Sequence, residues 1–369
     1  MAKAKRIKKP STRVSAASLR SQVDRLDRDL IKAINQRAQL AAKLNKQLEQ
    51  EGASFYALRE DDARIAQLVE TNKGPLSERC VRAILRELVS GSRALHQQRR
   101  VAYLGPAYSY SHLAAMRQFG QSCELVPVGG ISAVFEEVHS GRVDFGLVPL
   151  ENSTDGRVAD TLEMFTKLRV RICGEVQLRI HHHLLAKCPR SEIAEVYSRP
   201  QALSQCRNWL AKQLPGVRTV EVSSTSTAAQ LAQGKPGAAA IASIQAGVHY
   251  GLDVLAEKIE DNQANVTRFA VIGDQSAPRT RRDKTALMFE ISHHAGSLAD
   301  AMAIFKRNRL NLTWIESFPV PNRRGAYLFF IEMEGHENDA RVRRALASLG
   351  RKSLMLEVLG SYERAEPIE

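Results

Sequence analysis

The sequence is poor in cysteine and has no long apolar segment. Its 369 residues include five cysteines, which form no Cys-x-x-Cys pair and show no regular spacing. This pattern argues against a zinc site or a disulfide scaffold and is typical of a protein from a reducing compartment. No apolar run reaches the length of a membrane span, so we expect a soluble, cytoplasmic protein without a membrane partner.

The sequence also lacks a basic stripe interleaved with aromatic residues, although its net charge is +13. Residues 1–13 contain six basic side chains and no acidic one. We expect this segment to be a solvated, disordered tail, and we expect no nucleic-acid partner. A nucleic-acid-binding arm and an organellar transit peptide are the alternative interpretations of the tail.

At 369 residues the chain is too long for one compact core, so we expect two or three domains. Residues 14–98 predict an all-α domain, because apolar residues recur at helical spacing from Leu19 to Leu48 without a glycine or proline. A helix of about 30 residues is long for an isolated domain. We therefore expect a partner chain, in a homodimer or a homotetramer.

Short strand-like segments alternate with helical ones between residues 100 and 275. This alternation predicts an α/β domain with a mostly parallel sheet, long enough for two lobes around a cleft, like a periplasmic binding protein. From residue 284 to 362 the order strand–helix–strand–strand–helix–strand predicts a ferredoxin-like βαββαβ domain. That small domain has no obvious acid–base pair, so we expect a regulatory or pairing role for it.

The segment VPLENSTDG, residues 148–156, ends a nearly continuous apolar run. Such a run predicts a strand that is buried on both faces. Ligands of open α/β sheets bind beyond the carboxyl ends of the strands. We therefore expect Glu151 and Asn152 to line a cleft, and we expect residues 153–155 to cap the following helix.

Three motifs, VPLENSTDG, YSRPQALSQC and NVTRFAVIG, resemble those of the bifunctional P-protein family. That family joins an AroQ-type chorismate mutase domain, a prephenate dehydratase domain and a C-terminal ACT regulatory domain, and the resemblance covers the chain after the basic tail. It implies conversion of prephenate to phenylpyruvate, carbon dioxide and water in L-phenylalanine biosynthesis, without a cofactor. Positioning and a proton donor suffice for this chemistry. Prephenate and its amino analogue arogenate both fit the motifs.

The resemblance assigns the catalytic role to Thr267, whose hydroxyl would hydrogen-bond or protonate the leaving hydroxyl. Glu151 and Asn152 would form the polar wall of the same site. The neighbouring Arg268 either binds a substrate carboxylate or pairs with Glu151 or Asp261, and the sequence leaves both alternatives open.

Further substrate contacts are implied at Ser198, Gln205, Ser109 and Ser111. Two positions depart from the family pattern. Arg199 stands in place of a histidine, which replaces a switchable donor by a fixed cation. Tyr108 stands in place of a glycine, and its side chain disfavours a positive φ.

In the helical domain, Arg20 and Arg37 match two substrate-binding arginines of the family. On one helix they would point about 100° away from each other, so each site would need Arg20 from a second chain. Leu48 stands where the family has a lysine, and loss of that cation predicts weak or no mutase activity. A fully bifunctional enzyme that also takes chorismate is the alternative. Ser92 is retained, and a one-residue gap in the match would also retain Arg59 and Glu60.

The segments AGSL and ESFP resemble the family's effector-binding patterns and imply phenylalanine contacts from Gly296, Ser297, Leu298, Glu316 and Ser317. Phe318 replaces an arginine there, so the residues themselves do not favour inhibition by phenylalanine. The histidines at 181–183 do not predict a metal site, because adjacent strand residues alternate faces. A catalytically silent anion-binding sensor is the alternative of another class.

Overall fold

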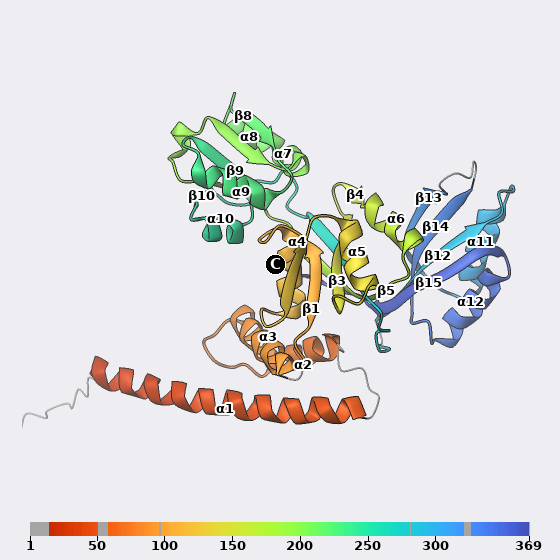
Figure 1. Ribbon diagram of the computed structural model, residues 1–369, viewed down its shortest axis with the longest axis horizontal. Helices are drawn as coiled ribbons and strands as arrows, with labels where there is room; N and C mark the ends of the chain where they lie inside the picture. The colour runs from red at the N-terminus through yellow and green to blue at the C-terminus, as the bar shows by residue number, and fades with distance from the viewer. Residues whose placement is uncertain (1–14, 51–57, 96, 281, 321–325, 369) are drawn as a thin grey trace, which may run out of the picture.

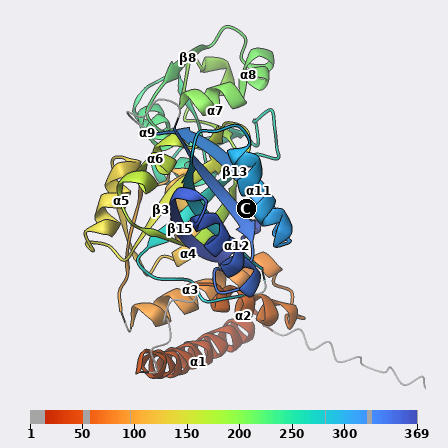
Figure 2. The same cartoon turned by 90° about the vertical axis from the view of Figure 1, so that its right-hand side faces the viewer.

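The computed structural model describes residues 15–50, 58–95, 97–280, 282–320 and 326–368, except for the side chains of residues 49 and 58–63. A helical part lies at one end, a two-lobed α/β part lies in the middle, and a β-rich C-terminal part lies beside one lobe (Figures 1 and 2). None of the described helices combines the length and the apolar character that a membrane crossing requires.

The described N-terminal part consists of helices α1 (Ala16–Gln50), α2 (Leu58–Glu70) and α3 (Glu78–Ala94). Helix α1 continues for 35 residues, or about 52 Å, because no glycine or proline interrupts it. Helix α3 begins after Ser77, whose hydroxyl accepts a hydrogen bond from the Cys80 amide. The predicted long helix is confirmed. Its side chains Leu26 and Leu40 are 68% and 66% exposed, so the structure leaves an apolar surface along α1 uncovered.

Lobe 1 of the central part is a seven-stranded sheet in the order β16-β5-β11-β3-β1-β2, with β4 paired to β3. Strands β1, β2 and β3 are parallel, whereas β11 runs antiparallel to β3 and β5. Helix α4 packs on one face, and α5 and α6 pack on the other. The elements are β1 (Arg100–Leu104), α4 (Tyr110–Phe119), β2 (Glu124–Val128), α5 (Ile131–His139), β3 (Phe145–Asn152), β4 (Gly156–Arg157), α6 (Ala159–Lys167), β5 (Arg171–Arg179), β11 (Val266–Gly273) and β16 (Pro367–Ile368).

Lobe 2 is a five-stranded sheet in the order β10-β6-β9-β7-β8. The chain enters lobe 2 after β5 and leaves it before β11, so two segments, residues 180–182 and 257–265, connect the lobes. The predicted α/β part is confirmed. The elements are β6 (His183–Ala186), η1 (Arg190–Glu192), β7 (Glu195–Ser198), α7 (Pro200–Gln205), α8 (Arg207–Gln213), β8 (Arg218–Glu221), α9 (Thr225–Gly234), β9 (Ala238–Ala242), α10 (Ile244–Tyr250) and β10 (Asp253–Ala256).

The C-terminal part has the predicted βαββαβ order: β12 (Asp283–Ile291), α11 (Ser297–Arg307), β13 (Leu312–Pro319), β14 (Tyr327–Glu334), α12 (Ala340–Gly350) and β15 (Ser353–Glu363). Its antiparallel sheet has the order β13-β14-β12-β15. Helices α11 and α12 cover one face. The other face shares a core with lobe 1, where Met288 and Phe330 pack with Val148 and Leu150.

The last described residues return from the C-terminal part to lobe 1. Strand β16 pairs in parallel with β5, with Pro367 opposite Gln177 and Ile368 opposite Leu178. The sheets also approach closely at Gly360, where a Cβ atom would lie 2.1 Å from the carbonyl oxygen of Ile172. Only glycine fits this contact. The C-terminal sheet is connected to lobe 1 twice, since its first strand β12 follows β11 and its last strand β15 is followed by β16.

Candidate functional site

A β-bulge decides which side chains meet at the end of β3. Thr267 pairs with Asn152 and Arg268 with Glu151, but Phe269 then pairs with Pro149, which leaves Leu150 as the extra residue. Bulges of this kind re-aim side chains near functional sites. As a result, Asn152 turns to the face of Thr267 and α4, whereas Glu151 turns to the face of Arg268.

A network of carboxamides surrounds the Thr267 hydroxyl. The Nδ2 of Asn152 donates to the Oγ1 of Thr267 at 2.8 Å and to the Oδ1 of Asn265 at 2.9 Å. The Nδ2 of Asn265 donates to the Oε1 of Gln205 at 3.0 Å. The Thr267 oxygen therefore accepts one hydrogen bond and keeps its own proton for donation. We call Asn152, Thr267, Asn265 and Gln205 the amide–threonine network.

The network continues through His182 to Tyr110. The Nε2 of His182 lies 2.9 Å from the Oε1 of Gln205, and its Nδ1 lies 3.1 Å from the hydroxyl of Tyr110. Burial lowers the pKa of His182, so its imidazole is neutral and can donate through Nε2 to Gln205. Asn265, His182 and Tyr110 were not among the predicted site residues. Asn265 is part of the NVTRFAVIG motif, which was the available signal for it.

The predicted role of Arg268 in substrate binding is contradicted by its contacts. Its guanidinium is bonded to Glu151 at 2.7 Å, to Glu175 at 2.8 Å and to Glu332 at 2.6 Å. Of the two interpretations left open, structural pairing with Glu151 is confirmed. Asp261 is the wrong partner, since its carboxylate accepts from the Asn208 amide. Burial would lower the pKa of Arg268, but the carboxylates of Glu332 and Glu175 outweigh burial and raise it.

The expected position of Glu151 is also corrected. Its carboxylate lies on the sheet face that meets the C-terminal part, because the bulge leaves it opposite Arg268. Lys284 contacts Glu175 at 2.8 Å and Glu332 at 3.1 Å, which completes a cluster between the two sheets. We call Arg268, Lys284, Glu151, Glu175 and Glu332 the inter-sheet ion cluster. Glu151 belongs to this cluster and not to the wall beside Asn152.

The predicted helix cap at residues 153–155 is wrong, because α6 begins only at Ala159. The Oδ1 of Asn152 instead accepts from the amides of Thr154 at 2.9 Å and Asp155 at 3.1 Å. The Oδ2 of Asp155 accepts from the Nε2 of Gln205 at 3.0 Å. This turn therefore holds Asn152 in place and connects lobe 1 to lobe 2.

Three predicted substrate contacts are serines in the interior. Ser198 is fully buried and donates to the Ile241 carbonyl at 2.6 Å, so the expected substrate contact of its hydroxyl is not available in this structure. Ser109 caps α4 by accepting the His112 amide and donates to the Leu104 carbonyl. Ser111 lies buried in the same helix. Among the five predicted contacts of this kind, Gln205 is the one that joins the amide–threonine network.

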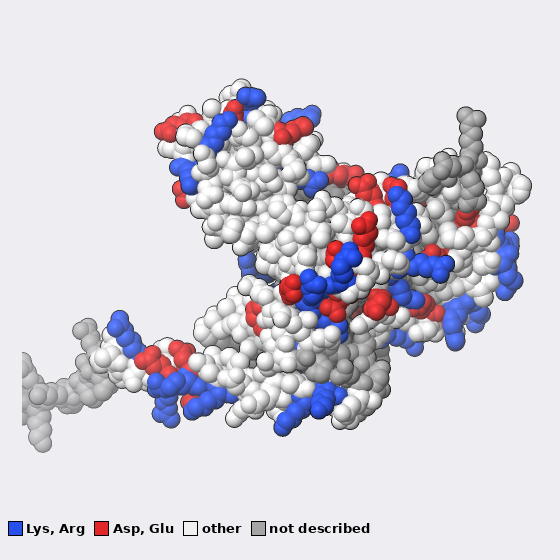
Figure 3. All heavy atoms as spheres, in the orientation of Figure 1, with Lys and Arg blue, Asp and Glu red and all other residues white. Residues whose placement is uncertain are grey.

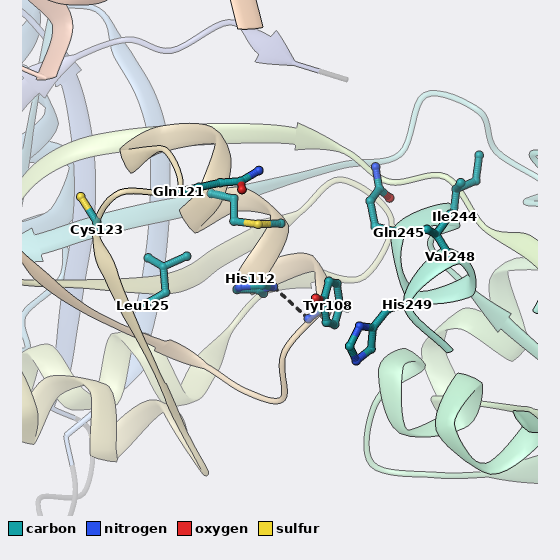
Figure 4. A pocket seen from close by; sticks show the side chains of 10 residues that line it. Tyr108, His112, Gln121, Cys123, Leu125, Ile244, Gln245, Val248 and His249 are labelled. Atoms are coloured by element: carbon teal, nitrogen blue, oxygen red, sulfur yellow. Dashed lines mark hydrogen bonds between the residues drawn. The ribbon is translucent and has the colours of Figure 1, made fainter. Parts of the chain in front are cut away.

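Tyr108 adopts a φ of 62°, although its side chain disfavours this region. Its amide donates to the Nδ1 of His112 at 2.9 Å. Its ring stacks on His249 of α10, with a centroid distance of 4.0 Å, beside a cavity of about 630 Å³ (Figure 4). Ser226 of α9 also donates to the Ala107 carbonyl at 2.6 Å. These contacts tie the loop before α4 to lobe 2, which offsets the backbone cost at Tyr108.

In the helical part, the guanidinium of Arg37 donates to the Ser92 hydroxyl at 2.7 Å and to the Leu88 carbonyl at 3.1 Å. Arg20 is exposed in the first turns of α1, about 25 Å along the helix axis from Arg37. One chain therefore cannot bring both arginines to one ligand. The side chains of Arg59 and Glu60, which begin α2, lie outside the described residues.

The predicted effector residues lie on two different elements. Gly296, at φ 87°, precedes α11, which begins with Ser297 and Leu298. Glu316 and Ser317 lie on the edge strand β13, where Arg157 of lobe 1 bonds the Glu316 carboxylate at 2.6 Å. In the described residues, no cluster of histidine, cysteine and carboxylate side chains could hold a metal ion.

A hydroxyl and three carboxamides from strand ends of lobe 1, a connecting segment and α7 of lobe 2 meet between the lobes, which is typical of an enzyme that acts on a small polar molecule. Residues 101–277 match the family model of prephenate dehydratase, and residues 19–97 match that of chorismate mutase type II. The chain belongs to the bifunctional chorismate mutase/prephenate dehydratase family.

Relatives and solved structures agree with this assignment. The chain is 40% identical to the bifunctional chorismate mutase/prephenate dehydratase of Stutzerimonas stutzeri, over 94% of this chain and 97% of the relative. It is 30% identical to that of Escherichia coli K12, over 95% and 97%. The structure of the Arthrobacter aurescens prephenate dehydratase in complex with L-Phe superimposes with a TM-score of 0.67 and 33% identity, over 72% of this chain and 90% of that one.

Proposed function

We propose that the chain is a prephenate dehydratase that forms phenylpyruvate for L-phenylalanine biosynthesis, with Thr267 donating a hydrogen bond to the leaving hydroxyl. The hydrogen bond from Asn152 to Thr267 at 2.8 Å supports this proposal. Because the Thr267 oxygen is already an acceptor, its proton is directed to a further partner. Asn152 therefore acts as the residue that orients the catalytic hydroxyl.

The reaction is a coupled elimination. The bond between the ring and its carboxylate breaks, carbon dioxide leaves, and the released electron pair enters the ring. The bond between the ring and its hydroxyl breaks at the same time, and the hydroxyl leaves as water after taking up one proton, which comes ultimately from solvent. The neutral carboxamides of Asn265 and Gln205 can position the substrate without stabilising a carboxylate on the ring, which must depart.

Replacing Thr267 tests this proposal. The Thr267→Ala variant removes the donor and is expected to form phenylpyruvate from prephenate about 10²–10³-fold more slowly, as followed by absorbance. The Thr267→Ser variant keeps a hydroxyl and is expected to retain most of the rate. A Thr267→Ala variant with the rate of the original protein would contradict the role of Thr267. Prephenate binding without turnover by the original protein would favour a silent anion-binding sensor.

For the helical part, we propose a dimerisation role with weak or no chorismate mutase activity. Leu48 lacks the cation that the ether oxygen of chorismate would require, and the separation of Arg20 from Arg37 along α1 means that a site with both arginines needs two chains. The names of the relatives equally support a fully bifunctional enzyme. Chorismate consumption by the purified protein distinguishes the two, and Leu48→Lys is expected to raise it if the rest of the site is intact.

For the C-terminal part, we propose an ACT-type regulatory role with L-phenylalanine as effector. The Arthrobacter aurescens relative was solved with L-Phe, and the contact of Glu316 with Arg157 of lobe 1 supplies a physical connection. The exposed apolar surface of α1 supports a homodimer or a homotetramer. Prephenate dehydratase assays with added phenylalanine test the regulatory role, and assays with arogenate test the substrate preference.

A further inference from the structure

A cavity of about 480 Å³ lies where the helical part, lobe 1 and lobe 2 meet. Its wall is formed by α3, by α4 with the end of β5, and by the segments that connect the two lobes. A hollow between lobe 2 and the parts below it is visible in Figure 3, beside the region where Figure 1 places α4 and α10. The volume falls in the range of small-molecule sites.

One face of α3 supplies the helical side of this cavity. Arg79, Ala83 and Arg86 follow one another at helical spacing and all line the cavity. Ser92, which holds Arg37 of α1, lies about 120° around the helix from Arg86. The cavity is therefore distinct from the mutase-like site on the other side of α3.

The charge of the cavity wall is unbalanced. Five arginine and lysine side chains line it against two glutamates. Within the part of the chain that the structure describes, the side chains of Arg79, Arg86 and Lys258 make neither a hydrogen bond nor an ion pair. They lie on two different elements, α3 and the segment that leads out of lobe 2. Arg79 and Lys258 are exposed and Arg86 is half-buried, and unpaired cations that line one recess favour an anion.

The same cavity has an apolar side. Leu113 and Met116 of α4, Leu178 of β5 and Ile244 of α10 contribute to its lining. An inorganic anion would use the cations and leave this surface unused. A ring that carries a carboxylate uses both, because the ring covers apolar surface and the carboxylate meets the arginines.

Tyr110 connects the cavity to the amide–threonine network. It lines the cavity, and its hydroxyl lies 3.1 Å from the Nδ1 of His182. His182 in turn contacts Gln205 at 2.9 Å. The Tyr110 hydroxyl also donates to the His181 carbonyl at 2.6 Å, so a ligand in the cavity would contact a side chain that is fixed beside His182.

We propose that this cavity is a binding site for a small ring-bearing carboxylate, separate from the site at Thr267. Arg79 and Arg86 bind the carboxylate from α3, and Lys258 binds it from the opposite wall. The choice of phenylpyruvate and prephenate as probes rests on the proposed function, since both compounds have this chemistry. The bound ligand connects the helical part to the segments between the lobes.

Calorimetric titration of the full chain tests the proposal. Phenylpyruvate is expected to occupy two sites per chain, one of which is lost or weakened about tenfold or more in Arg86→Ala. Arg82→Ala removes the same charge from α3 without touching the cavity lining, and it is expected to keep both sites. Alanine favours helix, so the two variants are expected to fold alike, which circular dichroism checks. Lys258→Gln provides an independent variant on the opposite wall.

Prephenate is a dianion and phenylpyruvate is a monoanion, so titration of prephenate into Thr267→Ala shows whether the second site also accepts the dianion. Binding of either compound at the second site supports the proposal. Inorganic phosphate is expected to bind at least tenfold more weakly, because it has no ring. A single site per chain for both compounds, equal binding of phosphate, or unchanged binding in Arg86→Ala and Lys258→Gln would overturn the proposal. Loss of turnover in Thr267→Ala without loss of the second site separates this test from that of the proposed function.

Discussion

The Nδ2 of Asn152 donates to the Oγ1 of Thr267 at 2.8 Å, although 115 residues separate them in the sequence. Asn152 ends β3, Thr267 is the second residue of the neighbouring antiparallel strand β11, and lobe 2 is inserted between β5 and β11. Thr267 lies directly after the segment that leads out of lobe 2, whereas Asn152 ends a strand within lobe 1, so the hydrogen bond joins lobe 1 to the chain that returns from lobe 2.

Asn152→Asp is expected to lower the rate of phenylpyruvate formation by about 10²-fold or more. Aspartate keeps an oxygen for the amides of Thr154 and Asp155 but loses the Nδ2 donor, and its carboxylate would accept the proton of Thr267. Steady-state kinetics with prephenate measure the effect. Asn152→Ala, which removes donor and acceptor together, serves as the comparison. An Asn152→Asp variant as active as the original protein would exclude an orienting role.

Arg268→Met is expected to lower the free energy of unfolding by about 3–5 kcal/mol, because it leaves buried carboxylates of the inter-sheet ion cluster without their partner. Urea unfolding measures this value. Arg157→Ala removes a partly exposed arginine whose pair with Glu316 is worth about 0–1 kcal/mol at most. Equal losses from the two substitutions would show that the cluster is no stronger than a surface pair.

Stability is expected to fall as the pH decreases below about 6.5. Burial lowers the pKa of His182 in the folded chain, and the pKa values of His112 and His183 are lowered by burial as well. The unfolded chain therefore binds more protons in this range, so stability is complete above the unfolded pKa and is lost as the pH falls. Urea midpoints between pH 5 and 8 test this. In the His182→Gln variant the urea midpoint is expected to depend less steeply on pH. An unchanged dependence of the midpoint on pH would rule out a contribution from His182.

Deletion of residues 366–369 is expected to lower the free energy of unfolding by about 1–2 kcal/mol, because Ile368 leaves the core between β5 and α4. Differential scanning calorimetry of the full chain and of the deletion variant measures the loss of stability. Ile368→Ala in the full chain separates the side-chain contribution from that of the strand pairing. A deletion variant with an unchanged melting temperature would show that β16 adds nothing to the sheet.

The helical segment, the strand–helix alternation and the βαββαβ order were predictable because local periodicity determines them. The meeting of Asn152, Gln205 and Thr267 was accessible through the three motifs. The separation of Glu151 from Asn152 follows from the ordinary alternation of adjacent strand residues, but which of the two faces Thr267 was not predictable, because a single extra residue in β3 reverses the alternation and leaves no signal in composition. Pairing of Arg268 with Glu151 was among the predicted alternatives, but its partner Glu332 was hidden, because that residue comes from a different sheet.

Strand β16 was equally invisible, because two residues are too short for a periodic pattern. It has a mechanical consequence. Since the C-terminal sheet is connected to lobe 1 at its first strand through β11 and at its last strand through β16, it has no single pivot about which to swing. A hinge rotation about one end is therefore disfavoured, and a shift of one sheet over the other would be limited first where Gly360 lies against Ile172.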